Sequence, residues 1–146
     1  MEINEIKFYS VNEAYGAFSN FALYPIKING KVWPTTEHYF QAQKFKGTPY
    51  ENKIRKAPSP MKAAIMGRSR KFKLRKDWEK VKDSIMYEAV KRKFLQYQEL
   101  KELLLSTENA QIIEHTVNDN YWGDGGNGKG KNKLGKILMK IREELK

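Results

Sequence analysis

The sequence predicts a single α+β domain that is mostly helical and contains a small β component. Hydrophobic residues recur at helical spacing through the second half of the chain, whereas short alternating runs flank Asn29-Gly30 near its start. No internal repeat, linker or low-complexity tract divides the 146 residues. A chain of this length buries roughly two thirds of its unfolded surface, so it needs no metal or disulfide to fold. We therefore expect one domain over residues 1–146.

The β component is expected near the N-terminus. Residues 6–9 read as one extended segment, and residues 26–28 and 32–33 read as two more. The last two flank Asn29-Gly30, and an Asn-Gly between alternating runs is the strongest short-range signal of a β-hairpin.

Two shorter helices are expected after the hairpin. Thr35 caps a helix over residues 36–45, and a break containing Gly and Pro follows at residues 47–49. Pro58-Ser59-Pro60 then opens a short helix that ends at Gly67.

The second half of the chain predicts a long helix, a short helix, a strand and a final helix. Apolar residues recur at helical spacing over residues 77–97, and the next segments are a helix at 100–105 and a strand at 111–117. Asn132 is expected to cap the last helix, whose buried face consists of Leu134, Ile137, Leu138, Ile141 and Leu145.

The formal charge of +11 favours a polyanionic partner or a phosphorylated small molecule. Twelve Lys or Arg and only two acids lie between Lys53 and Lys82, so part of the excess is concentrated. Lysine-rich, solvated faces explain the same composition equally well, and a nucleic-acid surface is the competing interpretation.

Cysteine is absent from the sequence, which excludes disulfides, thiolate nucleophiles and cysteine metal sites. Apolar runs are far shorter than a membrane span, and the N-terminal stretch MEINEIKFY begins with acids instead of a signal peptide. A cytoplasmic protein is therefore expected.

A glycine-rich segment, DNYWGDGGNGKGKNKLG, raises the question of a phosphate site. Gly123, Gly125 and Gly128 fit G-x-G-x-x-G, and Gly123, Gly128 and Lys129 fit most of the nucleoside-triphosphate loop. Gly130 replaces the magnesium-binding hydroxyl, however, and residues 119–122, directly before Gly123, are not a buried strand, so a triphosphate loop is not expected. Six of the ten glycines lie here, ahead of a helix, which suits either a phosphate held by backbone amides or a flexible connector.

The expected helix over residues 36–45 places an acid, an amide and an amine on one face. Glu37, Gln41 and Lys44 are spaced by four and seven residues, which nearly complete whole helical turns. A catalytic group is one interpretation, and a solvent-exposed polar stripe is the other. His38 is expected to be packed or exposed, because the only other histidine is His115 and no set of metal ligands is evident.

Aromatic residues stand beside polar residues at several positions. Phe18, Ser19 and Asn20 belong to the stretch FSNF, Trp78 begins the long helix, and Trp122 follows Tyr121. Aromatic faces combined with amides and carboxylates suit a planar base and a ribose. Core packing, or a simple turn at Ser19 and Asn20, are the structural alternatives.

An ordered set of motifs resembles the NADAR family over nearly the whole chain. These motifs are FSNF, TTEHYFQAQKF, MGR, DW, AVKRKF and DNYWGDGGNGKGKNKLGKILMKIREEL. Val117 stands where the family commonly has a proline ahead of the aspartate, which affects only the expected shape of the local loop.

The resemblance implies a cofactor-free N-glycosidase. Family members cleave the bond between ribose C1 and an exocyclic amine, in phosphoribosylamino intermediates of riboflavin synthesis or in guanine that carries ADP-ribose. Because the glycosidic nitrogen bears a hydrogen, the sugar can open to an imine, which a lysine can attack to form a Schiff base. The excess of positive charge slightly favours ADP-ribosylated DNA or RNA as the substrate.

The resemblance also assigns roles. Lys44 is expected to be the attacking amine, Glu37 the acid/base, and Asp119 a second carboxylate that holds ribose hydroxyls or activates water. The expected substrate-binding residues are Phe18, Ser19, Asn20, Gln41, Arg68, Trp78, Trp122, Gly123, Gly125, Gly126 and Gly128. No metal ligand is expected.

Two other functions remain open from the sequence alone. A sensor module would bind ADP-ribose or a related nucleotide without cleaving it, although it would have no need for both Glu37 and Lys44. A general basic nucleic-acid-binding protein would show steep salt dependence and no need for Glu37.

Overall fold

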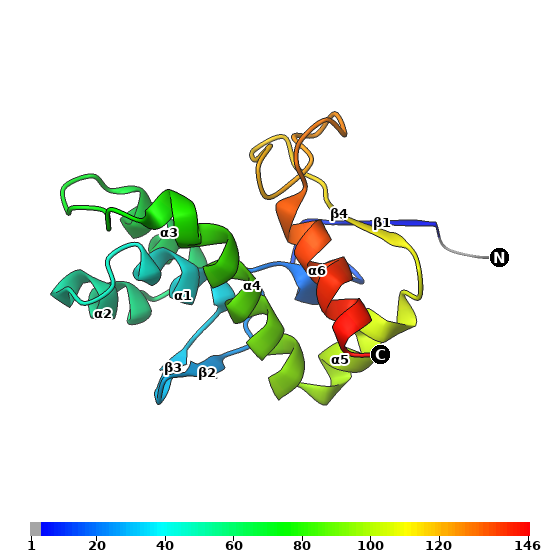
Figure 1. Ribbon diagram of the computed structural model, residues 1–146, viewed down its shortest axis with the longest axis horizontal. Helices are drawn as coiled ribbons and strands as arrows, with labels where there is room; N and C mark the ends of the chain where they lie inside the picture. Colours follow the sequence, from blue (N-terminus) through cyan, green and yellow to red (C-terminus); the bar gives the residue numbers. More distant parts are fainter. Residues whose placement is uncertain (1–3) are drawn as a thin grey trace. The chain divides into compact units, whose positions relative to one another are not determined.

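The computed structural model describes residues 4–146, which form six α-helices, one 3-10 helix and four strands (Figure 1). The α+β class predicted from the sequence is confirmed, and helix exceeds strand as expected. The described residues divide into two compact units, residues 20–93 and residues 4–19 with 94–146. The single domain of residues 1–146 stays a prediction. Residues 1–3, where the acidic N-terminal stretch begins, lie outside the described residues.

The unit of residues 20–93 begins with the predicted hairpin. Strand β2 (Ile26–Ile28) pairs antiparallel with β3 (Lys31–Trp33), with Ile26 opposite Trp33. Asn29 and Gly30 have φ angles of 53° and 79°. Two successive positive φ values are what a two-residue hairpin turn requires, and Asn and Gly tolerate them best.

Three helices follow the hairpin: α1 (Thr36–Gln43), α2 (Pro49–Arg55) and α3 (Pro60–Arg68). Helix α1 contacts both α2 and α3 (Figure 1). The sequence predicted only a break at residues 47–49 and so missed α2. Pro49 is the first residue of that helix, where the missing N–H of proline costs nothing and its fixed φ suits the helix.

The long helix α4 (Trp78–Gln96) starts one residue later and ends one residue earlier than predicted. Its residue Ala89 belongs to a buried cluster in the unit of residues 20–93. The cluster joins the hairpin to α1, α2 and α3, and its members are Ile26, Ile28, Trp33, Tyr39, Ala42, Phe45, Tyr50, Ile54, Ala57, Ala63 and Ala89.

The other unit contains a two-stranded parallel sheet. Strand β1 (Glu5–Phe8) pairs with β4 (Gln111–Glu114), with Ile6 opposite Ile112. The unit also contains the 3-10 helix η1 (Gly16–Phe18), α5 (Gln98–Ser106) and α6 (Lys133–Glu144). Strand β4 ends before the predicted Val117.

Helix α6 packs against β4 (Figure 1). Asn132 is the N-cap residue, as predicted, but its side chain does not cap the helix. Its amide nitrogen donates to the carbonyl of Ile112, and its oxygen accepts from the backbone N–H of Glu114. A side chain at Gly135 would overlap the Ile112 carbonyl, so glycine permits this close approach. Leu134, Leu138 and Ile141 are fully buried.

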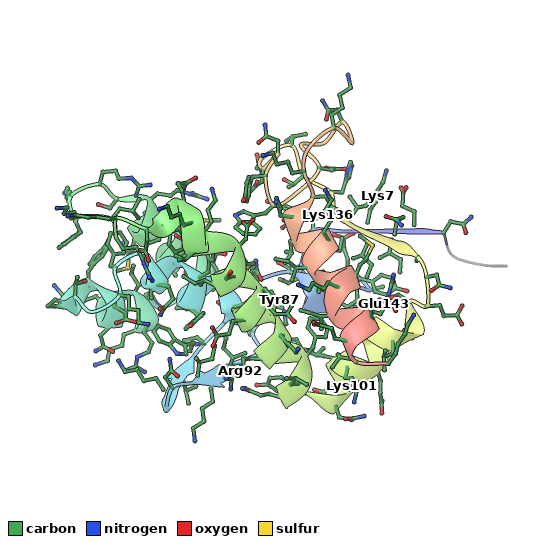
Figure 2. All side chains as sticks on the ribbon, in the orientation of Figure 1. Lys7, Tyr87, Arg92, Lys101, Lys136 and Glu143 are labelled. Carbon is green, nitrogen blue, oxygen red and sulfur yellow. The ribbon has the colours of Figure 1, made fainter. Side chains whose placement is uncertain are left out.

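Basic side chains are spread over both units. Lys7 comes from β1, Arg92 from α4 and Lys136 from α6 (Figure 2). All three are exposed. The charge excess therefore extends beyond the basic segment of residues 53–82. None of the helices formed by residues 4–146 combines the length and apolar character needed to cross a membrane.

Candidate active site

The segment that contains α1 is buried throughout. Every residue from Thr35 to Phe45 is largely inaccessible to solvent. The exposed polar stripe considered from the sequence is therefore wrong. The carboxylate, amide and ammonium groups of this segment must instead be satisfied inside the protein or by a ligand.

The N-terminus of α1 is held by a chain of hydrogen bonds. Thr35 Oγ1 accepts from the backbone N–H of His38 at 3.1 Å and lies 2.8 Å from His38 Nδ1, while His38 Nε2 lies 3.0 Å from the carbonyl of Ala57. Burial lowers the pKa of His38. A neutral ring that donates from Nε2 and accepts at Nδ1 satisfies all these contacts, so His38 has a structural role.

Asn20 also belongs to this support. The hydroxyl of Thr36 donates to Asn20 Oδ1 at 2.7 Å, and the backbone N–H of Glu37 donates to the Asn20 carbonyl at 3.2 Å. Asn20 Nδ2 contacts the sulfur of Met86 at 3.4 Å. The amide predicted to contact substrate thus fixes the first turn of α1, which positions Glu37.

Glu37 and Gln41 form a buried pair. Their exposed fractions are 8% and 6%, and Gln41 Nε2 donates to Glu37 Oε2 at 2.7 Å. Gln41 Oε1 has no hydrogen-bond partner among the described residues. A side chain at Gly67 would overlap Gln41 Oε1, so the absence of a Cβ on α3 makes room for the amide.

Lys44 follows α1 directly and is 9% exposed. Its Nζ donates to the carbonyl of Gly67 at 3.4 Å. The same nitrogen lies 5.9 Å from the ring centre of Phe40 and 5.8 Å from that of Trp78. The two rings pack against each other edge to face, 5.0 Å apart. The amine is therefore held between a backbone carbonyl and two aromatic rings.

The pKa of Lys44 is lowered to about 8, first by burial and then by the nearby charges of Arg70, Arg68 and Lys82, whereas Glu37 acts in the opposite direction. At pH 7 an amine with this pKa is neutral about one time in ten, compared with a few times in ten thousand for an ordinary lysine. A neutral amine is a nucleophile, so this segment can present a nucleophilic nitrogen.

Sequence reasoning missed Arg70, the carbonyl of Gly67 and the ring of Phe40 as parts of this environment. Arg70 Nη1 donates to the same Gly67 carbonyl at 3.2 Å. The only signal for Arg70 was its place in a run of six cations from Arg68 to Lys76, which does not distinguish one arginine from another. The predicted Arg68 is exposed at the end of α3.

The predicted Asp119 and the glycine segment belong to the other unit. Asp119 Oδ1 accepts from the backbone N–H groups of Tyr121 and Trp122 at 2.9 and 2.8 Å. This pattern shapes a turn, and it uses one oxygen of the carboxylate. The ring of Trp122 packs edge to face on Tyr121, 4.9 Å away.

Backbone amides of the glycine segment donate within the unit. Gly125 N–H donates to the Asp119 carbonyl, Gly126 N–H to the Asp124 carboxylate and Gly130 N–H to the Asp124 carbonyl. The expectation that Gly125 and Gly126 present free amides to a phosphate does not fit this arrangement. The positive φ values of Gly125, Gly126 and Gly128 account for the glycines by turn geometry instead.

Buried Asp124 organises this segment. Its Oδ1 accepts from Thr116 N–H at 3.1 Å and from Gly126 N–H at 2.8 Å, and its Oδ2 lies 2.7 Å from His115 Nδ1. Sequence reasoning missed Asp124, because a buried loop carboxylate leaves no periodic pattern in the sequence.

Phe18 and Ser19 also lie in the unit of the glycine segment. Phe18 is 1% exposed, and its ring centre lies 5.8 Å from those of both Phe8 and Phe94. Phe18 therefore has a packing role. Ser19 is buried, and its N–H donates to the Gly16 carbonyl. Of the predicted site residues, the structure brings together Glu37, Gln41, Lys44 and Trp78.

A family model described as the NADAR domain matches residues 7–146. The chain belongs to the NADAR family. N-glycosidase YbiA of Shigella boydii serotype 4 (strain Sb227) is 58% identical to this NADAR chain over 145 residues, which cover 99% of the chain and 91% of that protein. The NMR structure of Escherichia coli YbiA superposes with a TM-score of 0.91 at 57% identity, covering 99% of this chain and 86% of that one.

A riboflavin biosynthesis protein of Vibrio vulnificus (strain YJ016) is 40% identical over 140 residues, covering 96% of the NADAR chain and 38% of that longer protein. The predicted family is confirmed. The predicted enzyme class, a hydrolase of N-glycosyl bonds, is confirmed by the names of relatives that match over nearly their full length.

Proposed function

We propose that this NADAR protein hydrolyses the bond between ribose C1 and an exocyclic amine through a Schiff base on Lys44, without a cofactor. The observation that carries the proposal is the buried face on which Lys44, with a pKa lowered to about 8, lies near Glu37. An amine and a carboxylate taken out of water are costly to keep, which is typical of groups that act on a substrate.

The first step opens the sugar ring. The glycosidic nitrogen loses its proton to the Glu37 carboxylate as the C1–O4′ bond breaks, and Glu37 returns the proton to the ring oxygen. The product is an imine between C1 and the exocyclic nitrogen. Gln41 supports this step because its amide holds Glu37 Oε2 at 2.7 Å and so fixes the carboxylate.

The second step exchanges one amine for another. Neutral Lys44 Nζ attacks C1, the bond from C1 to the exocyclic nitrogen breaks, and both protons of the lysine amine pass to that nitrogen, so the base leaves as a free amine and Lys44 is left as an imine to C1. Water then adds to C1 of the lysine imine and expels the lysine. One water is consumed in total, the free base and the free sugar are released, and Lys44 is regenerated.

The rings of Phe40 and Trp78 suit a role beside the amine. They lie 5.9 and 5.8 Å from Lys44 Nζ and keep water from one side of it. An apolar wall favours the neutral amine and slows hydrolysis of the imine before the base departs. Trp78 is 5% exposed, so we assign it to this wall and not to an open stacking platform.

Two substrate classes follow from different observations. The riboflavin biosynthesis proteins among the relatives favour a phosphoribosylamino-pyrimidine or -pyrimidinone. The charge of +11 and the cationic run from Arg68 to Lys76 favour ADP-ribosylated guanine in DNA or RNA. Both substrates contain the same secondary amine on ribose C1, so one mechanism serves both.

Other residues predicted from the sequence are also proposed to contact the substrate. Asp119 keeps its proposed role toward ribose hydroxyls or water through the carboxylate oxygen that the turn does not use. Arg68 is proposed to bind phosphate because it is exposed and permanently charged. Trp122, Gly123 and Gly128 are proposed to contact the substrate.

A side-by-side hydrolysis assay tests the proposal. Wild type, Glu37→Gln and Glu99→Gln are offered the riboflavin-pathway phosphoribosylamine and an oligonucleotide that carries ADP-ribosylated guanine. Glu99 is an exposed acid on α5 and serves as the matched control. Release of base by wild type and Glu99→Gln, lost in Glu37→Gln, would support the proposal and identify the substrate. No release from either substrate, with ADP-ribose bound in calorimetry, would favour the sensor.

A further inference from the structure

The carbonyl oxygen of Gly67 accepts hydrogen bonds from two cationic side chains. Lys44 Nζ donates to it at 3.4 Å and Arg70 Nη1 at 3.2 Å. Arg70 Nη1 also donates to the carbonyl of Ser69 at 3.2 Å, so two backbone oxygens hold the guanidinium. A shared acceptor places the two cations side by side.

Charged groups from each neighbouring element act on the Lys44 amine. Arg68 lies at the end of α3, Arg70 follows α3, and Lys82 belongs to α4. The positive charges of all three disfavour protonation of Lys44. Glu37 on α1 acts in the opposite sense. Arg70 has the largest effect of these charges, after burial of the amine itself. An arginine keeps its charge at every pH at which an enzyme works.

We propose that Arg70 is a positioning residue for Lys44: its permanent charge, fixed on the carbonyl that Lys44 also uses, keeps part of the lysine population neutral and nucleophilic. The inference rests on the proposed Schiff-base function, because it assigns a role to the same amine. The charge of Arg70 is the essential property. Its size and packing are secondary, because the side chain is exposed.

The shared carbonyl has a second consequence. Lys44 must leave Gly67 to reach C1 of a sugar, and Gly67 is buried. Loss of the only hydrogen-bond donor to a buried carbonyl costs free energy. When Lys44 leaves, the carbonyl of Gly67 still accepts the hydrogen bond from Arg70. The second donor therefore lowers the cost of moving the amine toward the substrate.

Titration of Lys44 by NMR tests the proposal independently of catalysis. Protein labelled with carbon-13 at the lysine ε position is titrated as wild type, Arg70→Gln, Arg70→Lys and Lys71→Gln, with Lys44→Arg used to assign the signal. We expect Arg70→Gln to raise the Lys44 pKa by about half a unit to one unit, the effect of one nearby and partly solvated charge. Arg70→Lys restores the charge and should titrate close to wild type. Lys71→Gln removes an equal exposed charge from the same segment and should have less effect.

Single-turnover rates complete the test. Arg70→Gln should lower the rate at pH 7 by about threefold to tenfold and move the acidic limb of the pH profile upward by the same amount as the NMR titration. An unchanged Lys44 pKa in Arg70→Gln would overturn the proposal. A raised Lys44 pKa in a protein that cleaves neither substrate would uphold the role of Arg70 while rejecting the proposed function.

Discussion

The side-chain amide of Gln41 donates a 2.7 Å hydrogen bond to the carboxylate of Glu37 one helical turn earlier, and both side chains are buried. The donor can only be the amide nitrogen, so the contact favours the ionised carboxylate that a general base needs. The two residues therefore act as one unit on the face of α1 that leads to Lys44.

Gln41→Met should lower kcat about tenfold with little change in KM, because it removes the donor while keeping the volume of the side chain. Gln43→Met is a matched control on the same helix, since Gln43 Nε2 donates to the carboxylate of Glu51 at 3.1 Å. Steady-state kinetics of both variants are compared. If kcat fell equally in both variants, the hydrogen bond from Gln41 to Glu37 would have only the structural role that the bond from Gln43 to Glu51 has.

Gly67→Ala should destabilise the protein, because its methyl group would overlap the buried amide of Gln41. Overpacking of this kind costs about 1–3 kcal/mol. Gln41→Ala in the same chain should recover part of the loss, and the double-mutant cycle measured by urea unfolding isolates the coupling. Additive free energies would show that the backbone shifts instead and that the two residues do not compete for space.

The single-turnover rate should rise about tenfold per pH unit below about pH 8 and level off above it. The reason is that burial lowers the pKa of Lys44 to about 8, and only the neutral amine attacks. The profile is measured from pH 5.5 to 9.5 with a substrate that does not titrate in this range. A rate that is level from pH 6 to 9 would exclude deprotonation of Lys44 as the controlling event.

Lys93, which is 1% exposed on α4, should make stability depend on pH in the alkaline range. Burial lowers its pKa from 10.5 to about 7. Between these values the unfolded chain binds more protons than the folded chain, so the free energy of unfolding rises with pH. Below pH 7 both states are protonated and the cost of the buried charge is fully present.

Lys93→Met should therefore remove a slope of up to about 1.4 kcal/mol per pH unit between pH 7.5 and 10. Lys80→Met, at an exposed position of the same helix, is the control and should leave the slope as in wild type. Urea unfolding across this range gives both slopes. A wild-type slope retained in Lys93→Met would show that Lys93 is charged in the folded protein at these pH values.

The sequence predicted the elements that are determined by short local patterns, such as turn residues, helix caps and helical spacing. The hairpin follows from Asn29-Gly30, the start of α1 from Thr35, and the shared face of Glu37, Gln41 and Lys44 from helical spacing. Helix α2 was missed because Pro49 was interpreted as part of a break, although it is the first helical residue.

The sequence did not predict that the polar face of α1 is buried. A polar stripe on a helix reads as exposed, and only the packing of α1 against α2 and α3 places it inside. The glycine segment was predicted to offer amides to phosphate, yet Asp119 and Asp124 take up several of these amides. Such hydrogen bonds connect residues at irregular spacing, so no periodic signal records them.

Reductive trapping shows directly whether Lys44 forms a Schiff base with the sugar. Wild type, Lys44→Arg and Lys93→Met are mixed with substrate, borohydride is added during turnover, and peptide mass spectrometry locates the adduct. Lys93→Met removes a second lysine that is buried among residues 4–146 and has a lowered pKa, and so controls for another reactive amine. We expect a sugar adduct on Lys44 in wild type and in Lys93→Met, and none in Lys44→Arg. An adduct on another lysine, or equal labelling of Lys44→Arg, would contradict it.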